Sequence, residues 1–357
     1  MTAVNKNTIL SLQFARGLAA ILVVIAHAID SSGNFGSSYI GSFKHFQNFG
    51  AIGVDVFFVI SGAIMIIITS KGDTHPSKFI IKRCIRILPL YWGVSAFCLI
   101  LSYKGFWPQI KSAEILQTIT IVPFFKSGYH AGHILFLGWT LSFEFYFYIV
   151  FTLALLFNRK NPFPILVLLL LIPIIAGYMV TDFTDERLKF FTNPIILEFL
   201  AGCCCGYLYI SRFQISKFIV WLMVIAGIGL MIFSIFNGFG YISEMPSTWD
   251  GSLSLQRVIR WGIPCTLLVT GLVLLEKNKA FSSNRLFIVC GDISYAAYLS
   301  HIFSIMVITA AWHHAGLQMP DVFILIAVPL SLFVAYAIYR LIEKPLILYL
   351  NKMLFKK

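Results

Sequence analysis

The chain has 357 residues, of which 59% are hydrophobic and only 12% carry a charge. A soluble domain carries about 25% charged residues, so this composition excludes an ordinary water-soluble protein. The net charge of +12 does not indicate nucleic acid as a partner, because the basic residues lie in several short segments between apolar runs. Such alternation is typical of membrane topology.

Apolar runs long enough to cross a bilayer recur along the whole chain. A membrane-spanning helix needs about 20 mostly apolar residues. We therefore predict an all-α polytopic membrane protein with about ten transmembrane helices, in which residues 1–357 form one membrane domain with no appended extracytoplasmic domain. The predicted spans are Ile9–Ile29, Ala51–Thr69, Ile85–Leu101, Ile134–Phe157, Phe163–Val180, Phe190–Ile210, Phe218–Phe236, Val258–Leu275, Leu286–Ala311 and Val322–Leu348.

The basic residues mark every second connection between these spans. They include Lys71, Lys78, Lys82, Arg83, Arg86, Arg159, Lys160, Arg212, Lys217, Lys277, Lys279 and Arg285. The positive-inside rule therefore predicts that both termini lie in the cytoplasm. The seven cysteines fit neither a disulfide framework nor a zinc-binding spacing, so we expect no metal site.

The first span carries Arg16, His27 and Asp30. The eleven residues from Arg16 to His27 return almost to the same helical face at about 100° per residue, so both side chains can face one interior groove. Asp30 roughly shares that face and could instead be an ordinary interfacial group. Arg16 lies about two turns into the bilayer, where an unpaired charge is costly.

The second span places Asp55 about 6 Å below the outer surface at 1.5 Å per residue. A carboxylate at this depth needs a hydrogen-bonding or cationic partner, and the arginine and histidine of the first span are available. Ser61 and Gly62 in the same span are most simply interpreted as positions of close helix packing.

A basic cluster, Lys82, Arg83 and Arg86, precedes the third predicted span. The positive-inside rule and contact with anionic lipid explain this charge by themselves. Arginine also offers forked donors to phosphate oxygens, so the cluster equally suits a phosphate-bearing ligand.

Two later spans also carry polar residues at depth. Glu144 lies near mid-membrane, so we expect it to be protonated, paired with Arg16 or turned to a wet cavity. In the ninth span, Ser294, Tyr298 and His301 share one helical face. His301 lies about 22 Å from the cytoplasmic end, at the predicted level of His27 and Asp55. Two histidines and an acid at one depth favour a functional site over isolated helix-to-helix hydrogen bonds.

Several segments together resemble the acyltransferase family 3 pattern, in its order and over almost the whole chain. They read FARGLAA at 14–20 followed by His27, GVDVFFVISG at 53–62, RCIRILP at 83–89, GWTLSFE at 138–144, SYAAYLSH at 294–301 and EKP at 343–345. The resemblance implies a multi-pass O-acyltransferase of the bacterial inner membrane. Its donor would be cytoplasmic acyl-CoA, most often acetyl-CoA, used as a substrate, with no permanently bound cofactor. Its acceptor would be a hydroxyl of a cell-surface carbohydrate, such as an exopolysaccharide or O-antigen unit, or its polyprenyl-linked precursor.

On this resemblance, Arg83 and Arg86, with Lys82 and Arg16, are candidates for binding the donor. His27 is the candidate general base, because an imidazole titrates near neutral pH. Asp55, Asp30 or Glu144 could orient it, and the sequence does not choose among them. His301, Tyr298, Ser294, Trp139 and Arg16 are candidates for contacts with the substrate or the oxyanion.

A transporter or flippase for a sugar, lipid or acyl metabolite is the alternative, since intramembrane His, Asp and Glu also build proton relays.

Overall fold

The computed structural model describes residues 9–42, 46–72, 74–121, 132–180, 185–237, 239–243, 245–249, 251–282 and 284–355, and this part of the chain is helical without a strand. The α-helices are α1 (Leu10–Ser32), α2 (Tyr39–Ser42), α3 (Phe46–Thr69), α4 (Pro76–Tyr103), α5 (Ser112–Thr120), α6 (Gly138–Phe157), α7 (Phe163–Met179), α8 (Glu186–Phe191), α9 (Leu197–Ile210), α10 (Lys217–Phe236), α11 (Met245–Trp249), α12 (Ser254–Arg257), α13 (Ile263–Lys277), α14 (Arg285–His314), α15 (Pro320–Ile338) and α16 (Lys344–Phe355). The short 3-10 segments are η1 (Gly33–Phe35), η2 (Pro194–Ile196) and η3 (Phe239–Ser243), and the π-helical segments are η4 (Val258–Gly262) and η5 (Tyr339–Glu343).

Within the described residues, nine helical stretches are long and apolar enough to cross a membrane. The remaining predicted span, Phe163–Val180, is the fifth in chain order and forms the apolar helix α7, which has 17 residues and is shorter than the other nine. The prediction of an all-helical, multi-pass membrane protein is therefore confirmed. The location of the two termini stays a prediction.

The predicted boundaries were wrong where polar residues or proline interrupt the apolar pattern. The third span was expected to begin at Ile85, but α4 begins at Pro76, a residue suited to the first helical turn. The predicted span Phe190–Ile210 is broken at Asn193, because Pro194 cannot continue the helix of α8. The last predicted span contains the π-helical segment η5 between α15 and α16.

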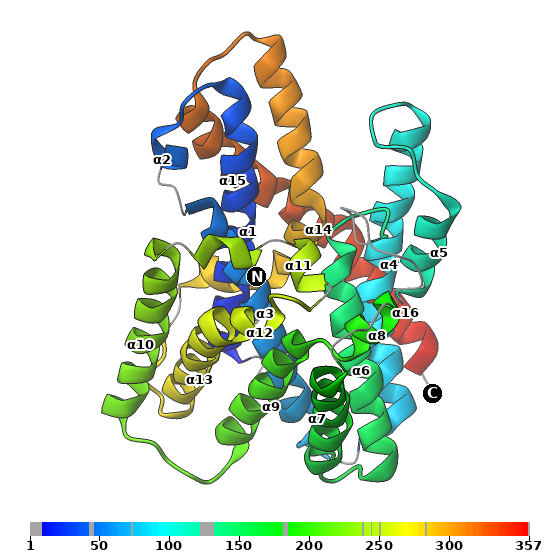
Figure 1. The fold of residues 1–357 in the computed structure, drawn as a ribbon, viewed down its shortest axis with the longest axis vertical. Helices are drawn as coiled ribbons and strands as arrows, with labels where there is room; N and C mark the ends of the chain where they lie inside the picture. Colours follow the sequence, from blue (N-terminus) through cyan, green and yellow to red (C-terminus); the bar gives the residue numbers. More distant parts are fainter. Residues whose placement is uncertain are drawn as a thin grey trace.

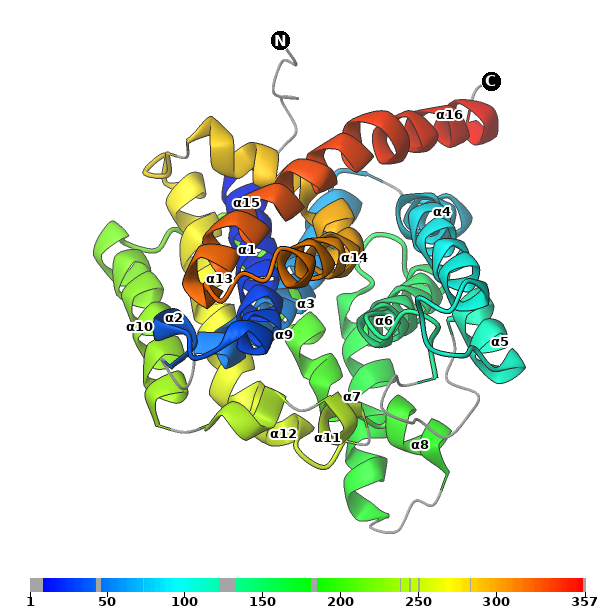
Figure 2. The same cartoon turned by 90° about the horizontal axis from the view of Figure 1, so that it is seen from above.

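Helices α1 and α3 lie at the centre of the bundle, between α10 and α13 on one side and α4 and α6 on the other (Figures 1 and 2). Helix α1 packs against α3, α14 and α15, while α3 also packs against α9. In Figure 2, α16 extends from the bundle toward α4. The central helices are therefore surrounded by other helices over much of their length.

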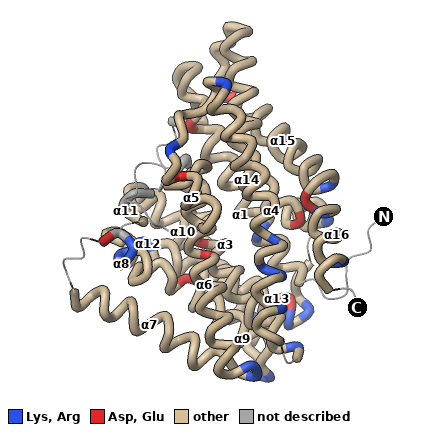
Figure 3. Tube along the Cα trace, turned by 90° about the vertical axis from the view of Figure 1, so that its right-hand side faces the viewer, with Lys and Arg blue, Asp and Glu red and all other residues tan. Residues whose placement is uncertain are grey.

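One end of the bundle, called the basic end below, gathers the predicted cytoplasmic connections. The start of α1 lies beside the end of α13, because Glu276 accepts hydrogen bonds from the backbone N–H groups of Leu10 and Ser11. The ammonium group of Lys277 donates to backbone carbonyls at the end of α9, including those of Leu208 and Ser211. Figure 3 shows basic residues at the lower ends of α9 and α13 and along α16.

The close approach of α3 and α9 requires glycine. A Cβ atom at Gly62 would lie 2.0 Å from the carbonyl oxygen of Phe199, and one at Gly202 would lie 2.0 Å from that of Val59. The interpretation of Gly62 as a close-packing position is confirmed. We expect Gly62→Ala to destabilise the protein by about 1–3 kcal/mol or more, because backbone must shift to admit the methyl group.

A thermal melt of the purified protein in detergent tests this expectation, with Gly229→Ala as the matched control. Gly229 lies on α10 with open space around it, so its added methyl group meets no neighbour. Equal melting temperatures for the two variants would contradict the tight contact between α3 and α9.

Candidate functional site

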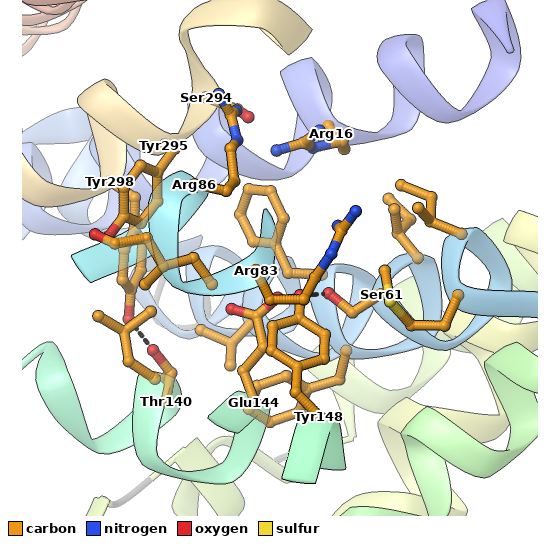
Figure 4. A pocket seen from close by; sticks show the side chains of 18 residues that line it. Arg16, Ser61, Arg83, Arg86, Thr140, Glu144, Tyr148, Ser294, Tyr295 and Tyr298 are labelled. Carbon is orange, nitrogen blue, oxygen red and sulfur yellow. Dashed lines mark hydrogen bonds between the residues drawn. The ribbon is translucent and has the colours of Figure 1, made fainter. Parts of the chain in front are cut away.

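A cavity of about 110 Å³ lies inside the bundle, and we call it the central cavity. Five helices, α1, α3, α4, α6 and α14, contribute to its wall. Figure 4 shows the polar side chains that face it. They are Arg16, Ser61, Arg83, Arg86, Thr140, Glu144, Tyr148, Ser294, Tyr295 and Tyr298. Six of the residues proposed from the sequence therefore meet here: Arg16, Arg83, Arg86, Glu144, Ser294 and Tyr298.

The three arginines of the central cavity differ in how they are paired. Arg86 donates a hydrogen bond of 2.7 Å to the carboxylate of Glu343, which is buried. Arg83 contacts the rings of Phe79 and Tyr148, and its Nε atom is buried without a hydrogen-bond partner. A buried, unpaired donor is rare in folded proteins and indicates a place that a ligand or water fills.

Arg16 approaches the cavity from α1, on a different side from Arg83 (Figure 4). Within the described residues it forms no ion pair, so the expected pair between Arg16 and Glu144 is not formed. Both side chains nevertheless face the same cavity. Arg16 and Arg83 thus supply two cationic groups that form no ion pair with any carboxylate in the described part of the chain, which suits an anionic ligand.

The carboxylate of Glu144 is held by two hydroxyl groups. The Oε1 atom of Glu144 accepts hydrogen bonds from Ser61 Oγ at 2.7 Å and from the hydroxyl of Tyr148 at 2.5 Å. The dashed line in Figure 4 marks the bond from Ser61. The interpretation of Ser61 as a packing residue was therefore wrong, because its hydroxyl fixes a carboxylate at the cavity wall.

His27 of α1 and His301 of α14 contact each other, with ring centroids 4.9 Å apart and an angle of 62° between the rings. The structure thus brings together the two histidines that the sequence placed at one depth. His301 is fully buried and His27 is half-buried. We call these two residues the histidine pair.

In each imidazole, a hydrogen bond to a backbone carbonyl of the same helix shows which ring nitrogen carries the hydrogen. His27 Nδ1 lies 2.9 Å from the carbonyl oxygen of Val23, and His301 Nδ1 lies 2.8 Å from that of Ala297. A carbonyl oxygen only accepts hydrogen bonds, so each Nδ1 carries the hydrogen and a neutral ring keeps its lone pair on Nε2. His301 Nε2 is buried and has no hydrogen-bond partner. The hydrogen-bond partner of His27 Nδ1 is therefore the carbonyl of Val23 and not one of the three candidate acids.

Tyr298 connects the central cavity to the histidine pair. Its side chain lines the cavity, and its ring centroid lies 6.3 Å from that of His301, one turn further along α14. The Tyr298 hydroxyl forms a hydrogen bond of 2.8 Å with Thr140 Oγ1, as Figure 4 shows. Ser294, one turn earlier on the same face, has a buried Oγ atom without a partner. A ligand in the cavity would meet both side chains.

Asp55 belongs to a different cluster from the one predicted. It is fully buried and forms a two-pronged ion pair with Arg257, with nitrogen-to-oxygen distances of 2.9 and 2.8 Å. The guanidinium of Arg257 also contacts the ring of Trp139, at 5.8 Å, and that of Trp261, at 5.1 Å. Asp55 and Trp139 are therefore engaged by Arg257, and neither lines the central cavity. Glu198 is buried beside this pair.

The sequence reasoning missed Arg257 because it directly precedes the predicted span Val258–Leu275 and resembled an ordinary interfacial residue. The π-helical segment η4 starts immediately after it, and the π-helical segment η5 ends at Glu343, the partner of Arg86. Segments of π-helix are rare and frequently occur at functional sites. Both buried ion pairs therefore adjoin a local departure from α-helical geometry.

Two further candidates lie away from the cavity. Lys82 is exposed, and its ammonium group lies 5.7 Å from the ring centre of Phe355 in α16, so the structure does not bring it to the donor candidates. Asp30 is exposed on α1, one turn beyond His27 and within electrostatic reach of it.

Breaking the buried pair should destabilise the fold. We expect Asp55→Asn to cost about 3–5 kcal/mol, because it removes the carboxylate that forms both hydrogen-bonded contacts with the buried Arg257 charge. The exposed pair of Asp185 and Arg187, at 2.8 Å, provides the control, since Asp185→Asn should change stability by less than about 1 kcal/mol. Thermal melts in detergent compare the two. Similar melting temperatures for the two variants would contradict a structural role for the buried pair.

Comparison with known proteins places these residues in context. Residues 9–340 match the acyltransferase 3 family, described as an acyltransferase domain. The chain is 33% identical over 306 residues to the exopolysaccharide production protein ExoZ of Rhizobium meliloti (strain 1021), which covers 85% of this chain and 91% of that protein. It is 24% identical over 328 residues to O-acetyltransferase OatA of Staphylococcus aureus (strain NCTC 8325 / PS 47), covering 83% of this chain and 52% of OatA. The chain thus spans about half the length of OatA. No solved structure matches the chain.

Proposed function

Because the chain belongs to the acyltransferase 3 family, we propose that it is a membrane O-acyltransferase of the bacterial inner membrane. Its donor is acyl-CoA on the cytoplasmic side, with acetyl as the first candidate for the acyl group. Its acceptor is a hydroxyl of a cell-surface carbohydrate or of its lipid-linked precursor. The names of the similar proteins support the two halves of this proposal, since one is an exopolysaccharide production protein and the other an O-acetyltransferase.

The observation that carries the proposal is the adjacency of the arginine-lined central cavity and the histidine pair. Arg16 and Arg83 face the central cavity and form no ion pair with the described residues, whereas His27 and His301 meet next to Tyr298 at its edge. A donor that is anionic at one end and carries a thioester at the other fits this arrangement. Its oxygen atoms can accept hydrogen bonds from the arginines, and its thioester must reach a base.

In the proposed reaction, Nε2 of His27 removes the proton from the acceptor hydroxyl. The hydroxyl oxygen attacks the thioester carbonyl carbon, the carbon–sulfur bond breaks and an ester forms. CoA leaves as a thiolate, which takes up the proton held by His27. Direct transfer of this kind and a transient acyl-enzyme are both compatible with the geometry.

Negative charge develops on the thioester carbonyl oxygen during the attack. Tyr298 is the candidate donor to this oxygen, because its side chain lines the central cavity and its ring lies 6.3 Å from that of His301. Arg16 lines the cavity farther from the histidine pair, and the Nδ1 hydrogen of His301 is already bonded to the carbonyl of Ala297. Preorganised donors of this type are usually worth about 10²–10³-fold in rate each. Burial of the Tyr298 hydroxyl keeps competing water away, which strengthens its effect.

Mass spectrometry of surface carbohydrate tests the proposal in cells. We expect carbohydrate from cells that express the gene to carry a fixed mass increment, released by mild alkali, that is missing when the gene is deleted. The increment identifies the acyl group and its acceptor together. Identical spectra from both strains would contradict the proposal.

A further inference from the structure

A second cavity, of about 210 Å³, lies between the start of α1 and the end of α3 at the basic end of the bundle. We call it the entrance cavity. Its wall consists of Ile9, Leu12, Gln13, Arg16, Ile64, Ile67, Ile68 and Lys71. Arg16 and Ile64 also line the central cavity, so these two side chains separate one space from the other. The two cavities are therefore neighbours with a shared wall.

The central cavity is too small for a whole acyl-CoA molecule. Pockets that enclose drug-sized ligands have volumes of about 300–1,000 Å³, well above the 110 Å³ found here. The narrow thioester arm is the only part of the donor that suits such a space. The bulky nucleotide part must then lie outside the central cavity, on a route that leads into it.

The cationic residues that could bind the phosphates of CoA indicate the same route, from the entrance cavity into the central cavity. The nucleotide part of CoA carries a diphosphate and a further phosphate, so it needs several cations. In the central cavity, Arg86 is already paired with Glu343. Lys71 lies at the end of α3, is exposed and lines the entrance cavity, with Arg16 further inside. An ammonium group on a flexible stem is well suited to phosphate oxygens.

We infer that the narrow arm of the acyl-CoA donor passes through the entrance cavity into the central cavity, and that the exposed Lys71 binds the donor phosphates outside it. Arg16 then lies beside the arm, at the wall that the two cavities share. This inference rests on the proposed function and deepens it. It assigns donor recognition to the ends of α1 and α3, in addition to the basic cluster on α4.

Steady-state kinetics of the full-length protein in lipid nanodiscs tests the inference with two donors. Acetyl-CoA carries the phosphates, whereas S-acetyl-N-acetylcysteamine has the thioester without any phosphate. We expect Lys71→Ala to raise the KM for acetyl-CoA about tenfold, the loss that follows from one charge-assisted contact. The KM for the truncated thioester should not change. Lys71→Arg should restore most of the affinity for acetyl-CoA.

Lys217→Ala is the matched control, because Lys217 is also exposed at the basic end but lines neither cavity. An unchanged KM for acetyl-CoA in Lys71→Ala would overturn the inference. An equal rise for both donors would also overturn it, since phosphate binding would then not be the cause. If the wild-type protein transfers the acyl group from the truncated thioester alone, there is no nucleotide site at Lys71. If it transfers from neither donor, the proposed function itself fails.

Discussion

Replacing His27 by asparagine should reduce acyl transfer by about 10²–10⁴-fold, the usual contribution of a general base. The amide nitrogen of asparagine can still donate to the carbonyl of Val23, as Nδ1 of His27 does at 2.9 Å. The variant can therefore keep the local hydrogen bond, while it removes the basic Nε2 atom together with the ring that contacts His301. Because His27 does not line the central cavity, the affinity for the donor should stay the same.

The measurement is single-turnover transfer from acetyl-CoA to the acceptor, together with donor binding by calorimetry. His314→Asn is the control, because His314 is exposed at the end of α14 and takes no part in the histidine pair. Full transfer by a well-folded His27→Asn protein would remove His27 from the mechanism. A loss of donor affinity equal to the loss of rate would show that His27 binds the donor and is not the base.

Replacing Arg83 by alanine should weaken the binding of acyl-CoA by about 10–100-fold with little change in thermal stability. Hydrogen bonds to charged groups are worth about 1.5–3 kcal/mol, which corresponds to this range. Arg83 contacts two aromatic rings, has a buried Nε atom without a partner and forms no ion pair with the described residues, so its removal should break none there. Its guanidinium group faces the central cavity, where it can contact the donor.

Arg86→Ala should behave differently, because it would leave the buried carboxylate of Glu343 without its partner. We expect a fall in melting temperature in addition to any loss of affinity. Lys82→Ala provides the control within the same basic cluster, because its side chain lies against Phe355 and should affect neither quantity. Calorimetric titration with CoA and a thermal melt separate these cases. If Arg83→Ala bound CoA as tightly as the wild-type protein, the basic cluster on α4 would be explained by membrane topology alone.

The helical class and most spans could be predicted because a bilayer requires long apolar helices. The depth of each residue then followed from a rise of about 1.5 Å per residue. This reasoning placed His27 and His301 at one level, and the structure shows their rings in contact. It also placed Arg16 and Glu144 where both face the central cavity.

The depth of a residue in the membrane does not reveal which helices are neighbours. The partners of buried polar residues could therefore not be predicted from the sequence. Asp55 was expected near the histidines, yet α3 turns its carboxylate to Arg257, which comes from the start of another span. The π-helical segment that follows Arg257 has no simple sequence signature. Three alternatives were open for Glu144, and the structure shows it at the wall of the central cavity, where it accepts hydrogen bonds from Ser61 and Tyr148 and forms no pair with Arg16.

The most direct test of the account uses the purified protein with acetyl-CoA and its carbohydrate acceptor. Free thiol from CoA and the new ester on the acceptor are measured in the same samples. The account predicts that both rise together in a one-to-one ratio, and that His27→Asn abolishes both. Movement of the carbohydrate across the membrane without release of free CoA would contradict it and would indicate a transporter.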